Sequence, residues 1–329
     1  MKKLVIPKGR TTAVKILWSG FRPMYDYWGN ELKRFYKFDT LVSSVSSYLE
    51  TKDKFINDTI HSVMGPAQIT SLKFHLFQEG KYQFIFKLTA ENKKLKKANF
   101  AFVVAKDGNE LTKTARIEHN ILKKLHLKCP QFVVKPYGGD YLFFPDRHGR
   151  KEFHRNIYAY MTEWLSGYEE LGINKDLQFY TNVLSPHTFS VSETNNIKIK
   201  IMEIILSLYN QENEESIVLP EIASGDFVIK RSPSKNHKLK MIACRGTLKR
   251  ITLEKLISLF LTTSWKWGNR KFTLLPDNPH DIVRTLVKIF GKEKTIIALN
   301  NLWNNEKNLL KNLAVPYEYV TVLKKSSIQ

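Results

Sequence analysis

The chain combines segments in which every second residue is apolar with segments in which apolar residues recur every three or four positions. From Ile69 the first pattern dominates, over 72–76 and again over 82–88, with a polar turn at 78–81 between them. This spacing predicts an antiparallel hairpin, because successive strand residues point to opposite faces of a sheet. An uninterrupted apolar run over 100–105 predicts a third strand.

Helical spacing lies on both sides of these strands. Residues 41–64 carry apolar residues at helical intervals and end at a Gly-Pro pair, and 111–125 forms an amphipathic pattern with Glu118 near its middle. Further short strands are predicted over 132–134, 141–144 and 157–161. The part up to residue 68 is rich in aromatic residues and is predicted to be a mainly helical N-terminal extension.

The second half of the chain is predicted to be mainly helical. Helices are expected over 176–184, 196–211, 252–262, 280–290 and 294–313, with one strand pair at 227–230 and 239–243. The pattern therefore predicts an α+β fold in three parts, namely an extension over 1–68, a small sheet-rich lobe over 69–165 and a large helical lobe over 166–329.

The charge of the chain adds a prediction about partners. With 52 Lys and Arg against 31 Asp and Glu, the net charge is +21, which attracts polyanions, namely nucleic acid, an acidic membrane surface or an acidic protein surface. The tryptophans and cations of 263–272 resemble base-stacking groups flanked by phosphate contacts, although the tryptophans can equally pack on the large lobe. The nucleic-acid candidates are Lys93, Lys94, Lys96, Lys97, Trp265, Lys266, Trp267, Arg270 and Lys271.

Cysteine usage and hydropathy bear on location. Cys129 and Cys244 lie far apart without metal-ligand spacing, and the nine histidines show no zinc-binding pattern. A reduced, cytoplasmic setting is expected. No apolar run approaches the roughly 18 residues that span a bilayer, and the basic start lacks the apolar core of a secretory signal.

The order of the small-lobe elements resembles the protein-kinase-like superfamily, in particular its aminoglycoside and choline phosphotransferase branch. The resemblance covers roughly 69–313 and rests on Gly80 in the first hairpin, Lys106 at the end of the third strand, Glu118 on the next helix and a hinge-like segment over 160–167. It implies a two-lobed kinase-like fold.

The resemblance also implies roles for these residues. Lys106 would hold the phosphates of ATP, Glu118 would orient Lys106, and Gly80 would let backbone N–H groups approach the phosphates. Backbone groups of the hinge, at Glu163, would meet the adenine ring.

The large lobe departs from the family pattern. Asp226 of Ser-Gly-Asp can take the place of the catalytic base, which leaves Arg231 where an Asn is expected; alternatively Asp226 takes the place of the metal-binding Asn, and Glu221 that of the base. Cys244-Arg245-Gly246 stands where the family has a magnesium-binding Asp, so conventional Mg²⁺ binding is not expected. Arg245 could supply a positive charge in place of the ion.

Three functional hypotheses follow. The leading one is a degenerate, pseudokinase-like domain that binds a nucleotide or serves as a scaffold. The first alternative is a basic nucleic-acid-binding or assembly protein built on an α+β platform. The second is an active ATP-dependent phosphotransferase acting on a small molecule or a protein.

Overall fold

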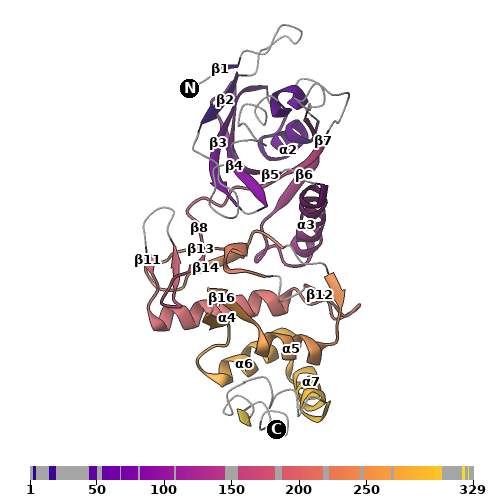
Figure 1. The fold of residues 1–329 in the computed structure, drawn as a ribbon, viewed down its shortest axis with the longest axis vertical. Coiled ribbons are helices and arrows are strands. Elements are labelled where there is room, and N and C mark those ends of the chain that lie inside the picture. Colours follow the sequence, from indigo (N-terminus) through magenta and orange to yellow (C-terminus); the bar gives the residue numbers. More distant parts are fainter. Residues whose placement is uncertain are drawn as a thin grey trace. The chain divides into compact units, whose positions relative to one another are not determined.

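The computed structural model gives a mixed α+β chain with one main sheet (Figure 1). It describes residues 3–4, 15–19, 44–49, 54–66, 68–80, 82–106, 109–144, 155–181, 187–217, 222–244, 248–267, 270–305, 321–322 and 325. The chain divides into two compact units. Unit 1 comprises Met1–Lys123 and Lys135–Leu165, and unit 2 comprises Lys124–Val134 and Ser166–Gln329.

The described strands of unit 1 form a seven-stranded sheet in the order β1-β2-β3-β4-β5-β7-β6. All neighbouring strands are antiparallel except β2 and β3, which run parallel. The strands are β1 Lys3–Leu4, β2 Lys15–Ser19, β3 Ile69–Glu79, β4 Gln83–Asn92, β5 Lys97–Ala105, β6 Pro136–Phe144 and β7 Arg155–Glu163. The predicted hairpin and third strand are thus confirmed.

One face of this sheet carries an aromatic core. Phe102 of β5 has no exposed surface and contacts Phe74 of β3 edge to face, with ring centroids 5.4 Å apart. Phe55 of helix α2 (Lys54–Met64) stacks on the same ring, with a centroid separation of 6.3 Å. Helix α2 therefore covers the Phe102 face, where β5 and β6 lie beneath it.

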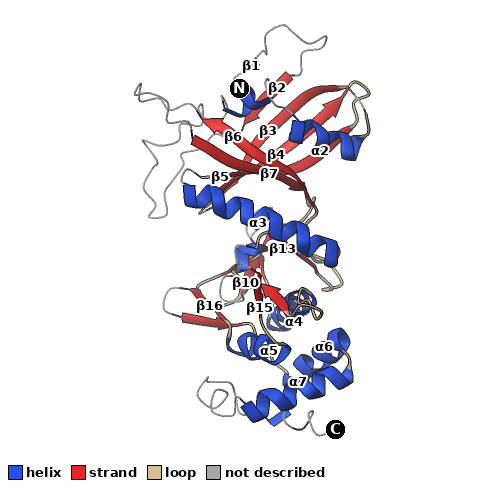
Figure 2. Cartoon of the chain, turned by 90° about the vertical axis from the view of Figure 1, so that its right-hand side faces the viewer, coloured by secondary structure: helices blue, strands red, loops and turns tan. Residues whose placement is uncertain are grey.

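Helix α3 (Asn109–Lys128) covers the other face. Its His119 stacks on the ring of Tyr160 at 4.8 Å, and Tyr160 pairs with Val103. Because Met161 pairs with Phe102, and because neighbouring strand residues point to opposite sides, Tyr160 lies on the face away from α2. Figure 2 shows the two helices on opposite sides of the sheet.

The expected extension is not separate from the small lobe. Strands β1 and β2 belong to the main sheet, and residues 44–49 and α2 are helical parts of the same unit. The expected boundary after residue 165 coincides with the boundary between the units, although Lys124–Val134 belongs to unit 2. The segment 132–134 makes a single bridge, between Val133 and Met241, in place of a strand.

Unit 2 is mainly helical and contains several short strand pairs. Its helices are α4 Val191–Ser207, α5 Leu253–Thr262, α6 Pro279–Phe290 and α7 Lys292–Asn305. Its strands are β8 Glu169–Glu170, β9 Gly172–Ile173, β10 Phe179–Thr181, β11 His187–Thr188, β12 Glu215–Ile217, β13 Phe227–Lys230, β14 Lys238–Met241, β15 Leu248–Arg250, β16 Ser264–Trp267 and β17 Arg270–Thr273. The predicted strand pair is β13 and β14, joined to β8 on the other side.

The helix predicted over 176–184 is wrong for the residues described there. Phe179 and Thr181 are buried, while Tyr180 between them is half-buried, which is the two-residue period of a strand. This strand, β10, pairs with β9 and β11. At Gly172 of β9, an added Cβ would lie 2.4 Å from the Tyr180 ring, so a larger residue there would displace this ring.

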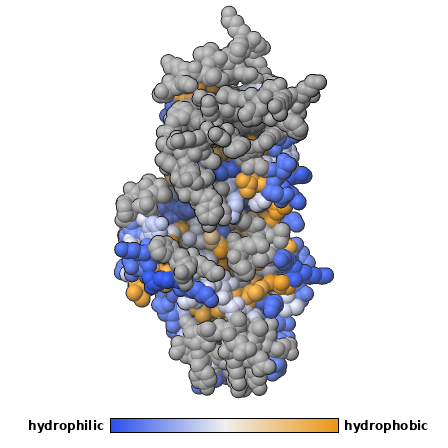
Figure 3. All heavy atoms as spheres, in the orientation of Figure 1, coloured by the Kyte–Doolittle hydropathy of each residue, from blue (hydrophilic) through white to orange (hydrophobic). Residues whose placement is uncertain are grey.

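In the view of Figure 3, the coloured residues are mostly polar, with apolar residues in small separate groups. Among the described helices, none is both long and apolar enough to cross a membrane.

Candidate functional site

Lys106, the expected phosphate-holding lysine, makes an ion pair within unit 1. It follows β5, and its backbone N–H donates to the carbonyl of Tyr82 at 2.8 Å. Its Nζ donates to Glu79 Oε1 at 2.7 Å and lies 5.2 Å from the centre of the Phe84 ring. The side chains of Lys106 and Glu79 are only 13% and 10% exposed, so solvent screens this pair weakly.

Glu118, the expected partner of Lys106, lies elsewhere. It is 1% exposed, and its Oε2 accepts a hydrogen bond from Gln83 Nε2 at 2.5 Å. Within the described part of unit 1, no ion pair joins Glu118 to Lys106. The sequence therefore brings both residues to the same end of the sheet without bringing them together.

The alternation of side chains between the two faces of the sheet explains why Lys106 and Glu118 lie apart. Phe84 pairs with Val104 and lies on the α2 side of the sheet with Phe86 and Phe102, so Lys106 above its ring is on that side. Gln83 is the neighbour of Phe84 and points to the α3 side, where it meets Glu118. The lysine and the glutamate thus lie on opposite faces of one sheet.

A double-mutant cycle tests this assignment. Lys106→Met and Glu79→Gln are each expected to destabilise unit 1, with a coupling free energy of about 2 kcal/mol, because the bond is short, charged and partly buried. Urea unfolding measures the four stabilities. The control cycle pairs Lys106→Met with Glu118→Gln, and its coupling should be close to zero. A larger coupling to Glu118 than to Glu79 would contradict the assignment.

The other two small-lobe candidates have ordinary backbone roles. Gly80 donates its N–H to the Gln83 carbonyl at 2.8 Å, and an added Cβ would meet that oxygen at 3.4 Å, which is normal contact. Glu163 donates its N–H to the carbonyl of Lys135, and its Oε1 accepts from the Lys135 N–H at 2.9 Å. The Glu163 N–H, one backbone group of the hinge-like segment, is therefore bonded to protein.

In unit 2, Asp226 ends a short 3-10 turn and immediately precedes β13. Its side chain is fully buried, and Oδ2 accepts from the Ala223 N–H at 2.8 Å. At Gly225, an added Cβ would lie 2.5 Å from Glu170 Oε1, so a larger residue there would displace the end of the Glu170 side chain. Within Ser-Gly-Asp, the buried Asp226 carboxylate thus has a structural explanation.

Replacing Asp226 distinguishes a structural role from a catalytic one. Asp226→Ala is expected to lower the free energy of unfolding of unit 2 by about 2 kcal/mol, because the half-buried Ala223 N–H loses a charged acceptor. Asp226→Asn keeps an acceptor oxygen and should lose less. Thermal and urea unfolding measure the difference. Unchanged or increased stability in both variants would favour a catalytic carboxylate over a structural one.

The remaining large-lobe candidates are only partly described. Cys244 follows β14 and is buried as a free thiol, and the Ile242 N–H donates to the Asp226 carbonyl at 2.8 Å. Arg231 donates from Nε to the buried Glu169 carboxylate at 3.1 Å. Glu221 and Arg245 lie outside the described residues. No group of three His, Cys, Asp or Glu residues suited to a metal ion occurs in the described ranges.

Within each unit, the expected ligand-holding residues named here are engaged with other protein groups or lack the expected carboxylate. Lys106 is bonded to Glu79 on the face opposite Glu118, and the Glu163 N–H is occupied. Asp226 Oδ2 caps a backbone N–H, and Cys244 supplies a buried thiol where the resemblance places an acid.

The two predicted basic segments differ in character. Lys93, Lys94, Lys96 and Lys97 are all exposed at the turn between β4 and β5. In contrast, the segment 263–272 forms the β16–β17 strand pair, and Trp265 is 6% exposed.

The rings of Phe179, Phe227 and Phe272 surround the indole of Trp265, which makes it a core residue unable to stack a base. Arg270 and Lys271 are exposed, and Arg270 donates to the Lys175 carbonyl at 2.8 Å. Of Lys266 and Trp267, the structure describes the strand positions only.

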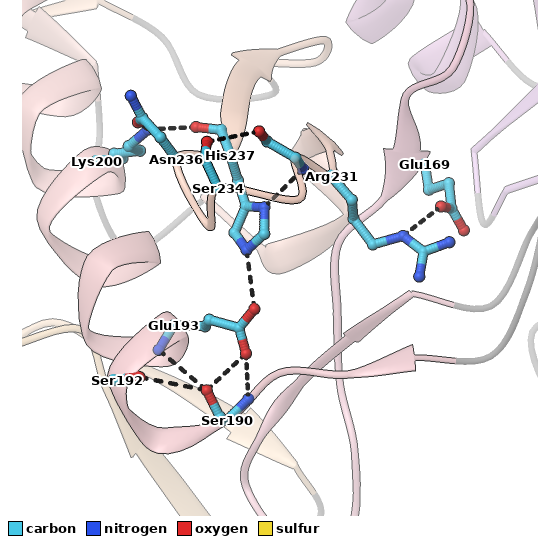
Figure 4. A network of polar contacts seen from close by, with 10 residues as sticks. Glu169, Ser190, Ser192, Glu193, Lys200, Arg231, Ser234, Asn236 and His237 are labelled. Carbon is cyan, nitrogen blue, oxygen red and sulfur yellow. Dashed lines mark hydrogen bonds and ion pairs between the residues drawn. The ribbon is translucent and has the colours of Figure 1, made fainter.

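A polar network at the start of α4 was not predicted (Figure 4). Ser190 and Glu193 form a capping box, and the bonds from Ser190 lower the pKa of Glu193 to about 2. His237 Nδ1 accepts from the Ser232 N–H at 3.1 Å, so its Nε2–H faces Glu193 Oε1 at 3.3 Å. Both ring nitrogens are engaged, and the network fixes the β13–β14 turn to α4. The S-x-x-E spacing was the available sequence signal.

His119 was also not predicted as a special residue. It is fully buried, its Nε2 donates to the Tyr137 carbonyl at 2.9 Å, and its Nδ1 accepts from the Tyr158 hydroxyl at 2.7 Å. Burial, and to a lesser extent Lys123, lowers the pKa of His119 to about 4. Burial raises the pKa of Tyr158 to about 12. At neutral pH this is therefore an uncharged, hydrogen-bonded core site.

A groove of about 800 Å³ within unit 2 is lined by the C-terminal ends of α3, α4 and α6. Its charged lining is balanced, and two of its lysines have partners: Lys128 Nζ bonds the Tyr209 carbonyl, and Lys288 Nζ bonds Glu203 at 2.6 Å. The charged lining residues are Lys124, Lys128, Lys288, Glu203, Glu212 and Glu215. The groove offers no concentrated charge to a ligand.

No protein-family model matches the sequence, and no curated protein matches it.

Proposed function

We propose that this chain is a kinase-like protein that does not transfer phosphate and that acts by binding a partner. The order of its elements supports the kinase-like part of the proposal. A hairpin (β3–β4), a third strand (β5), a helix (α3) and two more strands (β6 and β7) precede a mainly helical unit that contains the β13–β14 hairpin.

The observation that carries the non-catalytic part is the side of the sheet on which Lys106 lies. A kinase-like site needs the strand lysine and the helix glutamate to form one ion pair beside the phosphates. Here Lys106 pairs with Glu79 on the α2 side, while Glu118 meets Gln83 on the α3 side. Breaking the Lys106–Glu79 pair to free the lysine would leave a partly buried carboxylate without its cation, which is unfavourable.

The large-lobe residues agree with this proposal. Because β13 starts directly after Asp226, the register in which Asp226 takes the place of the metal-binding Asn fits better, which gives Glu221 the place of the base. The Asp226 carboxylate is buried and bonded to the Ala223 N–H. Cys244 provides no hard oxygen ligand of the kind that Mg²⁺ prefers.

Calorimetric titration with ATP, with and without Mg²⁺, tests the proposal. The full chain is expected to show no Mg²⁺-dependent binding, and Lys106→Met should leave the titration unchanged. Lys87→Met is the matched control, because Lys87 lies on the α3 side, 5.2 Å from the Trp164 ring. Mg²⁺-dependent binding that is lost in Lys106→Met but kept in Lys87→Met would overturn the proposal.

A further inference from the structure

The turn between β4 and β5 carries four lysines within five residues. Lys93, Lys94, Lys96 and Lys97 are all exposed, and Leu95 between them is 73% exposed. We call residues 92–97 the tip. Strands β4 and β5 pair continuously up to Glu91 and Lys97, so the tip joins the ends of two paired strands. On the other side of β4, strand β3 pairs with it as far as Asn92.

Asn92 gives the tip a defined backbone. Its side chain is 3% exposed, and its Oδ1 accepts from the N–H groups of both Lys94 and Lys96 at 3.0 Å. Its own N–H donates to the Lys96 carbonyl at 3.1 Å, and its carbonyl accepts from the Leu95 N–H at 2.9 Å. The backbone that carries the lysines is therefore fixed before any partner binds, which lowers the entropic penalty of binding.

Leu95 has a backbone conformation that is unfavourable for leucine. Its φ is +60°, in the left-handed region where glycine or asparagine is preferred over a leucine. Its side chain is mostly in water, so burial does not offset this conformation. A partner that buries Leu95 would account for an apolar residue here.

The charge around the tip is strongly positive. Glu91 lies 3.7 Å from Lys97 and 4.0 Å from Lys73. The described residues that form this patch are thus five lysines, at 73, 93, 94, 96 and 97, and one glutamate. Such a patch attracts phosphate groups at close spacing.

We infer that the tip binds double-stranded DNA, with its lysines on the backbone phosphates and Leu95 inserted between base pairs in the minor groove. Lysine contacts phosphate as a point charge without reading sequence, and single apolar side chains inserted at a base step are a known means of kinking a duplex. This inference goes beyond the proposed function and does not depend on the kinase-like resemblance.

The chemistry of the tip favours DNA over a membrane and over RNA. In unit 1, the described exposed large apolar residues are Leu95 and, at 42%, Val63 of α2. One inserted leucine suits a base step, whereas stable membrane binding usually takes more apolar contact. An A-form RNA duplex presents a wide, shallow minor groove and is recognised mainly by shape and by its 2′-hydroxyl groups, for which lysine and leucine have no specific complement.

The test is binding of the full chain to a fluorescent 20-base-pair duplex by anisotropy over a range of NaCl concentrations. Replacing all four tip lysines with Gln should lower affinity at least tenfold at about 0.1 M salt and reduce the slope of log K against log salt by about 3, because up to four phosphate contacts are lost. The matched control replaces four scattered exposed lysines with Gln: Lys113, Lys238, Lys249 and Lys292. It removes the same charge and should change the slope by less than about 1.

Leu95→Gly tests the inserted leucine side chain separately from the charge of the tip lysines. The folded structure should tolerate it, because glycine favours this backbone conformation. Affinity should fall about fivefold with an unchanged salt slope, and bending of the duplex, measured by energy transfer between its ends, should disappear.

Equal losses in the two lysine variants would overturn the inference, since general charge would then explain binding. Tighter binding to single-stranded DNA or duplex RNA than to duplex DNA would also overturn it. The inference would also be wrong if the variant without the four tip lysines lost binding to vesicles of phosphatidylserine and phosphatidylcholine while its binding to the duplex was unchanged.

Discussion

Phe102→Ala is expected to lower the free energy of unfolding of unit 1 by about 4 kcal/mol, because the side chain is fully buried and its removal leaves a cavity. The ring lies between Phe55 of α2, Phe74 of β3 and Phe86 of β4. Amide hydrogen exchange read by mass spectrometry measures the effect. Peptides from β2 and α2 should lose protection together with β3 to β5, because the expected extension is part of this core.

Phe77→Ala is the control for Phe102. Phe77 is half-buried and meets Trp164 edge to face, with ring centroids 4.9 Å apart, so its removal should destabilise unit 1 much less. If Phe102→Ala leaves the protection of α2 and β2 unchanged while the other strands open, the extension folds independently. The description of unit 1 as one packed unit would then be wrong.

Acidification is expected to destabilise unit 1 through His119. The pKa of His119 is about 4 in the folded chain against about 6.5 in an unfolded one, so the unfolded state takes up the proton first as the pH falls. The stabilising contribution is complete above about pH 6.5 and is lost progressively down to about pH 4. It amounts to about 3 kcal/mol. Urea unfolding across this pH range measures the loss.

His119→Gln provides the control for acidification. Glutamine keeps a donor for the Tyr137 carbonyl but does not titrate, so the variant should be less stable at pH 7 and should depend less on pH between 6.5 and 4. A pH dependence as steep as that of the natural chain would show that other groups cause it. His237, whose pKa burial also lowers, is the first alternative to examine, by His237→Gln.

The main strands were predictable because their residues follow a strict two-residue period. Phe84, Phe86 and Leu88 are buried and alternate with half-buried neighbours, and Phe100, Phe102 and Val104 face the same core. The short strand at Lys15–Ser19 was not predictable in this way. Its place in the sheet depends on parallel pairing with β3, a contact between residues more than fifty positions apart that local pattern does not encode.

The error over 176–184 has a similar origin. Apolar residues at 177, 179 and 184 are compatible with a helix, but Phe179 packs against Trp265 and Phe272 from a distant strand pair. The same packing explains why Trp265 is a core residue and not a base-stacking one. Short segments with few apolar residues take the structure that their tertiary contacts favour.

The order of residues along the chain did not predict which side chains meet. Lys106 and Glu118 occur in the order that the kinase-like resemblance expects, and the strand and helix next to them were both predicted. Which face of the sheet α3 covers, however, is set by the crossing from β5 to β6, and this places the two side chains on opposite sides. The acidic residue that meets Lys106 comes from the first hairpin, twenty-seven positions earlier.

The most direct test of the non-catalytic proposal is the turnover of γ-labelled ATP with Mg²⁺ by the purified full chain, followed as released phosphate and as label on the protein or on added basic and acidic protein substrates. Turnover should be no greater than that of Lys106→Met, and neither protein should transfer label. Turnover by the natural chain that Lys106→Met abolishes, while Glu79→Gln retains it, would contradict the proposal that this chain does not transfer phosphate.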